Sequence, residues 1–117
     1  MIVDDEHDIR LIARMSLERI GGWEVVDVGS AEDAVEAARS GPLDVVLLDV
    51  MMPGVDGPAA LELLRPVIGS ETPVIFLTAK TQAADRERLA ALGAAGVIAK
   101  PFDPMTLADE VSAWMVK

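Results

Sequence analysis

Cysteine is absent from the 117-residue sequence, and histidine occurs only once, at His7. The absence of cysteine excludes disulfide bonds and thiolate metal sites, and it suits the reducing cytoplasm. His7 has no cysteine or second histidine to share a metal or a catalytic role, so we interpret it as a residue in the first turn of a helix.

Long apolar stretches are also missing. The best apolar run, Val45 to Met52, is interrupted by Asp44 and Asp49 and is too short to span a membrane. At the start of the sequence, acidic residues 4–6 stand where a signal peptide would carry its basic region, so no signal peptide is expected. We therefore expect a cytoplasmic protein that makes no membrane contact.

Positive charge is scarce, with 10 Lys and Arg residues against 20 Asp and Glu residues and a net charge of −10. An acidic surface repels phosphate backbones, so this domain is not expected to bind nucleic acid by itself. The hydrophobic fraction of 51% is enough for a core, and the length fits one domain. We therefore expect a single domain over residues 1–117.

Five short apolar runs recur along the chain, and several are nearly continuous rather than alternating. Continuous Val- and Ile-rich runs are typical of strands that are buried on both faces of a parallel sheet. The predicted strands are residues 1–3, 23–28, 43–48, 73–77 and 96–99.

Segments with helical spacing lie between the runs. In the first, Ile9, Ile12, Met15 and Leu17, with Ile20 beyond, are expected on one apolar side of a helix. The later helices are expected at 31–39 behind a Ser30 cap, from 57 to an end or kink at Pro66, at 83–92 before Gly93, and from an Asp103 cap through Pro104 to about Met115. Five strand–helix alternations with right-handed crossovers predict a doubly wound α/β sandwich.

Polar residues follow the predicted strands. Asp4 and Asp5 end the first, Asp49 the third, Thr78 the fourth and Lys100 the fifth. Ligands of such folds bind beyond the carboxyl ends of the strands, where these side chains are expected to meet. Three carboxylates there repel one another, and Mg²⁺, which favours one or two carboxylates plus phosphate, offsets that charge. With the Lys100 cation and the Thr78 hydroxyl, the set predicts phosphoryl transfer onto a carboxylate.

Taken singly, these residues have ordinary explanations. An acidic pair at a strand end is often a solvated turn, a threonine there is often a cap, and a lysine is usually a surface charge. Only their joint placement favours a site. Residues expected simply to pack are Trp23, Trp114, Met51 and Met52.

Four segments resemble the receiver domains of bacterial two-component response regulators, over essentially the whole chain. Residues 2–6 read IVDDE, 47–57 read LLDVMMPGVDG, 77–79 read LTA and 100–102 read KPF. The resemblance implies a flavodoxin-like fold, with a five-stranded parallel sheet in the order 2-1-3-4-5 and five helices on its two faces. It also implies a signalling switch rather than an enzyme, limited to self-phosphotransfer and slow autodephosphorylation.

The resemblance assigns roles to single residues. Asp49 is the expected phosphoacceptor, and Thr78 and Lys100 contact the phosphoryl group. Mg²⁺ is the expected cofactor, held by the carboxylates of Asp5 and Asp49 and the carbonyl of Met51, with Asp4 acting mainly through water. The Lys100–Pro101 bond is expected to be cis.

The resemblance also implies partners. The phosphodonor is a histidine kinase or a histidine phosphotransfer protein, expected to dock over the first helix and the site rim. The apolar candidates there are Ile9, Ile12, Met51 and Phe102, of which at least one of the two isoleucines is expected to pack in the core instead. An output domain or effector protein, and dimerisation on phosphorylation, are further possibilities.

One position departs from the family. Receivers usually carry an aromatic residue three positions before the lysine, and here that residue is Val97. Two other functions are therefore considered. A haloacid-dehalogenase-like phosphatase also uses an aspartate and Mg²⁺, but its Asp-x-Asp follows the first strand and its cap domain does not fit in 117 residues. A degenerate receiver used only for protein binding is favoured mildly by Val97 and disfavoured by the complete site.

Overall fold

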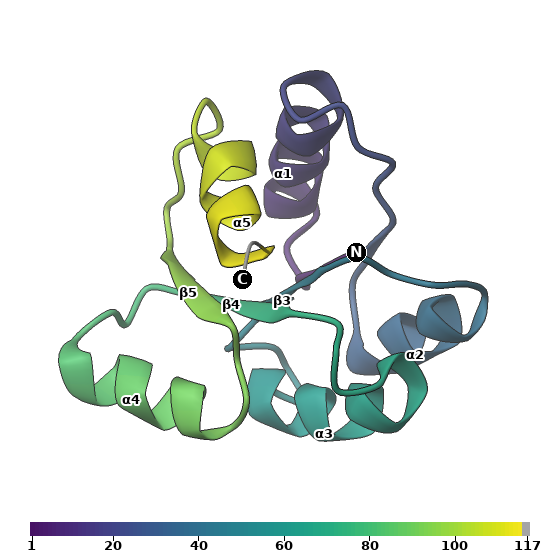
Figure 1. Cartoon of the computed structure of the whole chain (residues 1–117), viewed down its shortest axis with the longest axis vertical. Coiled ribbons are helices and arrows are strands. Elements are labelled where there is room, and N and C mark those ends of the chain that lie inside the picture. The colour runs from purple at the N-terminus through teal and green to yellow at the C-terminus, as the bar shows by residue number, and fades with distance from the viewer. Residues whose placement is uncertain (116–117) are drawn as a thin grey trace.

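The computed structural model describes residues 1–115 and shows a three-layer α/β sandwich (Figure 1). The last two residues of the expected domain, 116–117, lie outside the described part. All five strands are parallel, in the order β2-β1-β3-β4-β5. The strands are β1 (Ile2–Val3), β2 (Asp27–Val28), β3 (Val46–Asp49), β4 (Val74–Thr78) and β5 (Gly96–Ala99). The predicted fold class and strand order are confirmed.

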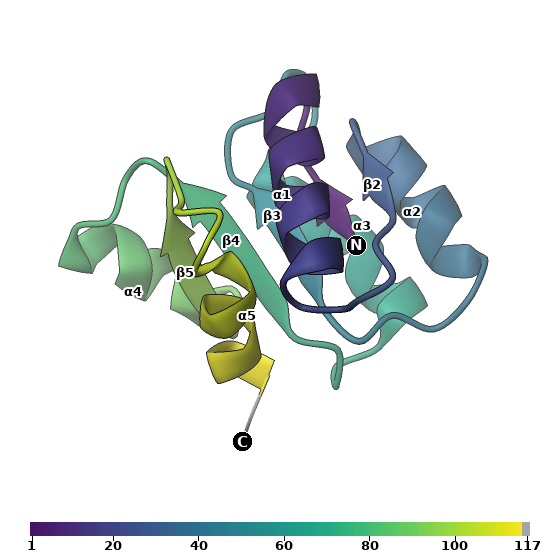
Figure 2. The ribbon, with the colours of Figure 1, turned by 90° about the horizontal axis from the view of Figure 1, so that it is seen from above.

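In the described part of the chain, five helices cover the two faces of the sheet. They are α1 (His7–Arg19), α2 (Ala31–Arg39), α3 (Gly57–Ile68), α4 (Ala83–Ala91) and α5 (Leu107–Met115). Figure 1 shows α1 and α5 on one face and α2, α3 and α4 on the other, and Figure 2 shows α1 and α5 from above. No helix within residues 1–115 is long and apolar enough to cross a membrane.

Two cores lie on either side of the sheet, because successive side chains of a strand point to opposite faces. Leu48 and Phe76 join the core under α2, α3 and α4. Leu47 and Ile75, their neighbours in sequence, join the core under α1 and α5. Both faces of β3 and β4 are therefore buried, which explains why their sequences read as continuous apolar runs.

The second predicted strand is too long. Only Asp27 and Val28 pair with β1, whereas residues 23–26 form no regular strand, although the carbonyl of Val26 still accepts the Ile2 N–H at 2.8 Å. β2 is an edge strand, and Val26 is largely exposed because no further strand covers it. Trp23 packs against the core under α1 and α5, as expected of a packing residue.

The predicted apolar side of the first helix is mostly wrong. Ile12, Met15 and Ile20 are exposed, and the buried residues are Ala13, Ser16 and Leu17. Small residues at the contact let α1 lie close to the sheet and to α5. The Ser16 hydroxyl is one of those contacts, because it donates to the carbonyl of Pro104 in the loop before α5.

Helix ends follow the predicted caps in part. Ser30 accepts the Asp33 N–H at 3.1 Å, and α4 ends before Gly93, both as predicted. Gly93 has a positive φ of 95°. α3 instead continues through Pro66 to Ile68, so the proline does not end it. α5 begins at Leu107 rather than at Pro104. The Asp103 carboxylate accepts the Met105 N–H, and its carbonyl accepts the N–H groups of residues 106 and 107, so residues 104–106 form a turn first.

Candidate functional site

Asp4 forms the buried floor of the site. It follows β1, and its N–H donates to the carbonyl of Val28 at 3.1 Å, which continues the β1–β2 pairing. Its side chain is completely buried, and Oδ1 accepts the Glu6 N–H at 2.9 Å. The carboxylate is therefore held in one orientation at the carboxyl edge of the sheet.

Asp5 and Asp49 stand beside it. One carboxylate oxygen from each of Asp4, Asp5 and Asp49 lies within 4.8 Å of the others. Asp49 ends β3 and is 3% exposed, whereas Asp5 is exposed to solvent. Parallel pairing of β1 with β3 brings their carboxyl ends together, so the predicted acidic cluster does form.

Lys100 bridges two of these carboxylates. Its Nζ lies 2.8 Å from Asp4 Oδ2 and 3.3 Å from Asp49 Oδ1, and its side chain is only 15% exposed. The lysine follows β5, where its N–H donates to the Thr78 carbonyl at 2.9 Å. The Lys100–Pro101 peptide bond is cis, as expected.

Burial and the charges of this cluster shift two pKa values. Burial raises the pKa of Asp49, and the Asp4 charge raises it further, against a smaller lowering by Lys100 and by the Met51 N–H. For Lys100, burial lowers the pKa, but its bonds to Asp4 and Asp49 outweigh that effect and raise it overall. The site thus combines a carboxylate that resists ionisation with a cation that retains its proton.

Thr78 and Met51 complete the predicted set. The Thr78 side chain is buried at the end of β4, and its Oγ1 accepts the Lys80 N–H at 3.0 Å. No hydrogen bond within residues 1–115 joins this hydroxyl to Asp49 or Lys100. The Met51 N–H donates to Asp49 Oδ1 at 3.4 Å, and the Met51 carbonyl accepts no hydrogen bond from the described residues.

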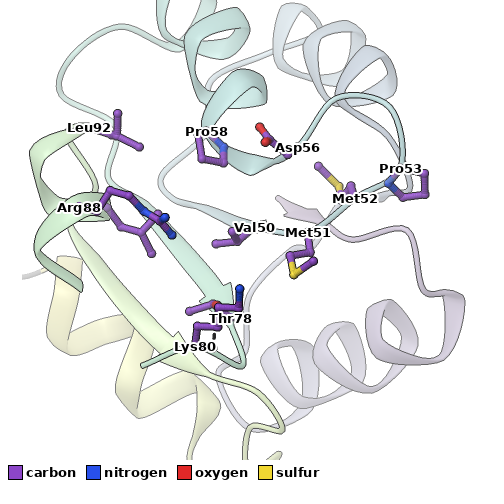
Figure 3. A pocket seen from close by; sticks show the side chains of 11 residues that line it. Val50, Met51, Met52, Pro53, Asp56, Pro58, Thr78, Lys80, Arg88 and Leu92 are labelled. Carbon is purple, nitrogen blue, oxygen red and sulfur yellow. Dashed lines mark hydrogen bonds between the residues drawn. The ribbon is translucent and has the colours of Figure 1, made fainter. Parts of the chain in front are cut away.

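A cavity of about 680 Å³ opens between the loop after β3 and helix α4 (Figure 3). Thr78 and Lys80 lie on one side of it and Leu92 and Arg88 on another, with Val50 between them. Met51 and Thr78 line this cavity and also contact the site, because the Met51 N–H donates to Asp49 and the Thr78 carbonyl accepts the Lys100 N–H.

The four docking candidates differ in exposure. Met51 is 69% exposed and Ile12 is 43% exposed, whereas Ile9 is half-buried and Phe102 packs partly against the core under α1 and α5. Within residues 1–115, neither Ile9 nor Ile12 belongs to a core cluster, so the expectation that one of them packs in the core is wrong. Of the predicted packing residues, Met52 is buried, and Trp114 lies over Gly96 while remaining 44% exposed.

Sequence reasoning missed Arg10. Its Nη1 donates to the carbonyl of Asp4 at 2.8 Å, and its Nε donates to Asp27 Oδ2 at 3.2 Å. Arg10 and Asp27 are separated by 17 positions, and no motif connects them. Only the parallel pairing of β1 with β2 brings Asp27 under α1.

Comparison with known proteins identifies the family. Residues 1–112 match the response regulator receiver domain. The transcriptional regulatory protein YvrH of Bacillus subtilis is 39% identical over 113 residues, which are 97% of this chain and 47% of that protein. ResD of the same organism is 36% identical over 97% of this chain and 46% of its own length.

Solved structures agree with the sequence matches. The chemotaxis response regulator CheY4 of Vibrio cholerae is 30% identical with a TM-score of 0.88, covering 97% of this chain and 94% of that one. The receiver domain of NtrX from Brucella abortus is 27% identical with a TM-score of 0.86, over 97% and 95% of the two chains.

The chain belongs to the response regulator receiver domain family of two-component signalling. Members of this family are signalling switches that act with histidine kinases and output domains. The chain spans about half the length of the curated relatives it matches.

Proposed function

We propose that this domain, over residues 1–117, accepts a phosphoryl group on Asp49 and thereby switches its output face. The observation that carries the proposal is the position of Asp49, which is almost buried at the end of β3 with Lys100 Nζ at 3.3 Å and two further carboxylates beside it. A nucleophile next to a fixed cation, in a crevice of oxygen donors, suits transfer of an anionic phosphoryl group.

The donor set fits a magnesium ion. Three carboxylates within 4.8 Å are poorly balanced by one lysine, and hard oxygen ligands are those that Mg²⁺ prefers. Both oxygens of Asp4 already accept bonds, from Glu6 and Lys100, whereas the carboxylate of Asp5 accepts none from residues 1–115. This difference supports Asp5 as a direct ligand and Asp4 as a residue that acts through water. Asp49 and the Met51 carbonyl complete the proposed set of direct ligands.

In this mechanism, a carboxylate oxygen of Asp49 attacks the phosphorus in line, as the bond from phosphorus to the donor's histidine nitrogen breaks. Lys100 stabilises the negative charge on the transferred oxygens. When bound, Mg²⁺ supplies further neutralisation of that charge. Thr78 then turns its hydroxyl toward the acyl phosphate. Slow hydrolysis of this bond resets the switch, so the only chemistry is on the domain itself.

The proposed partners follow from this reaction. A histidine kinase or a histidine phosphotransfer protein supplies the phosphoryl group, docking over α1 and the site rim, where Ile12 and Met51 are exposed. Since the full-length relatives are named as transcriptional regulators, we propose a DNA-binding output domain in the complete protein. Dimerisation on phosphorylation is part of the same proposal. Without cysteine, the chain suits the cytoplasm, the compartment we propose.

The test is chemical labelling. Wild type and Asp49→Ala are incubated with phosphoramidate and Mg²⁺, and the intact masses are measured. One added phosphoryl group on wild type, removed by hydroxylamine and absent from Asp49→Ala, is the expected result. Equal labelling of both proteins contradicts the assignment. No labelling of a folded wild type favours the alternative of a receiver used only for protein binding.

A further inference from the structure

Arg10 connects the acidic site to the edge of the sheet. Its guanidinium makes two bonds in different directions, to the main-chain carbonyl of Asp4 at 2.8 Å and to Asp27 of β2 at 3.2 Å. The side chain is 17% exposed, so most of the group lies within the fold. A planar guanidinium with several donors can hold two such acceptors in a fixed geometry, and an ammonium cannot.

Asp27 is itself held firmly. Its Oδ1 accepts a hydrogen bond from Arg14 Nη1 at 2.7 Å, while its Oδ2 accepts the bond from Arg10. Burial raises the pKa of Asp27, but the hydrogen bonds and charges of Arg14 and Arg10 outweigh it and lower the pKa overall. The carboxylate is therefore ionised at neutral pH and anchors Arg10 from the side away from Asp4.

Gly29 leaves room for this arrangement. A Cβ at this position would lie 3.0 Å from Arg10 Nη1 and 3.5 Å from its Cζ. The guanidinium thus lies directly against the backbone just after β2, in a space that a larger residue would reduce.

The hydrogen bond from Arg10 to the Asp4 carbonyl holds the peptide group that joins Asp4 to Asp5. The Asp4 carbonyl belongs to the planar peptide group that also contains the nitrogen of Asp5, so fixing the carbonyl fixes the orientation of the Asp4–Asp5 peptide plane. Asp4 has other anchors, through Glu6 and Lys100. The side chain of Asp5 has no hydrogen bond or ion pair within residues 1–115. The direction of its carboxylate therefore depends on the main chain.

We propose that Arg10, anchored by Asp27, is a positioning residue that fixes the Asp4–Asp5 peptide plane and so directs the exposed carboxylate of Asp5 toward Asp49. This inference rests on the proposed function, in which Asp5 and Asp49 share a divalent cation. Arg10 touches neither the cation nor the phosphoryl group, and its effect passes through the main chain.

The direction of the change in Mg²⁺ affinity distinguishes a positioning role of Arg10 from an effect of its charge. A guanidinium near a divalent cation repels it, so removing the positive charge alone strengthens cation binding. Losing the fixed peptide plane weakens it, and residues that orient metal ligands are typically worth 10- to 100-fold in affinity. Arg10→Gln is therefore expected to bind Mg²⁺ about tenfold more weakly than wild type.

Arg14→Gln is the matched control, because Arg14 is on the same helix and binds the same Asp27 but does not contact Asp4. Its Mg²⁺ affinity, measured by calorimetry, is expected to equal or slightly exceed that of wild type. Arg10→Lys keeps the charge and is expected to bind weakly, like Arg10→Gln. Wild-type affinity in Arg10→Gln or in Arg10→Lys, or equal weakening in Arg10→Gln and Arg14→Gln, overturns the proposal.

A second measurement needs no metal. In metal-free protein, the ¹⁵N order parameter of the Asp5 amide is expected to fall from about 0.85 toward about 0.6 in Arg10→Gln and to stay at the wild-type value in Arg14→Gln. If folded wild type neither binds Mg²⁺ nor accepts a phosphoryl group, the proposed function fails, and the order parameter still decides whether Arg10 fixes this segment. An Asp5 amide equally rigid in all three proteins overturns the inference.

Discussion

The ammonium group of Lys100 lies 3.3 Å from Oδ1 of Asp49, yet the pKa of Asp49 is still raised. Burial is the largest cause, and the nearby charge of Asp4 adds to it. Lys100 divides its attraction between the two carboxylates and lies closer to Asp4, at 2.8 Å. Ionised Asp49 is therefore a destabilising feature of the metal-free fold, which a cation or a variant can relieve.

Asp49→Asn is expected to be more stable than wild type at pH 7 in EDTA, by more than the roughly 0.5 kcal/mol typical of exposed substitutions. Because the folded pKa is raised above the unfolded value of about 3.9, the stability linked to Asp49 is fully present below that value and is lost as pH rises through the folded pKa. The difference in the free energy of unfolding between Asp49→Asn and wild type should therefore increase above about pH 4. Urea unfolding from pH 4 to 8 measures it, with exposed Asp109→Asn as control. A difference in unfolding free energy that becomes smaller with rising pH contradicts this prediction.

Asp27→Asn is expected to show the opposite pH dependence. The pKa of Asp27 is lowered in the folded protein. Its contribution to the stability of the fold is therefore present above about pH 4 and is lost as pH falls through the folded pKa. Loss of hydrogen bonds to a charged group should cost about 1 to 2 kcal/mol at pH 7, and the difference from wild type should shrink below pH 4. Urea unfolding at pH 3, 5 and 7 tests this. The exposed acid Glu24, changed to Gln, should show no such difference, and a cost independent of pH would refute the ionic explanation.

Millimolar Mg²⁺ is expected to raise the melting temperature of wild type, because a ligand that binds only the folded state stabilises it by mass action. Asp5→Ala should lose most of this response, and Asp4→Ala part of it. The matched control is Asp8→Ala, which removes a nearby acid of α1 that is 95% exposed and outside the cluster. Differential scanning fluorimetry with and without Mg²⁺ suffices. An unchanged response in Asp5→Ala, or none in wild type, would count against the metal site.

Gly96→Ala is expected to destabilise the fold by about 1 to 3 kcal/mol, the usual cost of overpacking. A Cβ on Gly96 would overlap the Trp114 ring, which must then move. Gly41→Ala is the control, since nothing lies within 4 Å of its Cβ position. Tryptophan fluorescence and urea unfolding report the change. In the Trp114→Ala background the Gly96→Ala cost should nearly vanish, and its persistence there would show that the ring is not responsible.

The sheet was predictable from sequence because its central strands are buried on both faces. Leu47 and Leu48 point to opposite cores, so both must be apolar, and the run is unmistakable. The edge strand was not predictable in length. Residues 23–26 are apolar enough for a strand, but Trp23 and Val25 pack inward while Val26 faces solvent without a neighbouring strand.

The buried face of α1 was predicted wrongly for a related reason. Periodicity counts large apolar residues, and Ile12 and Met15 suggested a face that the fold leaves exposed. The contact is made by Ala13, Ser16 and Leu17, whose small or polar members carry little hydrophobic signal.

The strand-end residues of the site were predictable, because parallel strands bring their carboxyl ends to one edge. Asp4, Asp5, Asp49 and Lys100 meet there as expected. Arg10 was not predictable, because its role depends on a main-chain carbonyl and on a partner in a strand two residues long. Neither feature appears in a pattern of side chains.

Thr78 and the loop after β4 are expected to carry the switch, since Val97 cannot serve as a moving aromatic ring. Val97 is half-buried and packs against the core that includes Leu89 of α4, so it has little freedom to change position. The Thr78 hydroxyl, by contrast, accepts the Lys80 N–H at 3.0 Å. If this hydroxyl turns toward an acyl phosphate on Asp49, the Lys80 bond is strained or lost, and residues 79–82 before α4 must rearrange.

Beryllofluoride with Mg²⁺ is therefore expected to shift the amide resonances of Lys80 and the α4 N-terminus in wild type and Thr78→Ser, but only weakly in Thr78→Val. Shifts should stay small around Gly93, after the C-terminal end of α4, whose carbonyl accepts a hydrogen bond from the Arg65 guanidinium. A saturated site that leaves Lys80 unmoved in wild type would refute the switch and favour a receiver that only binds partners.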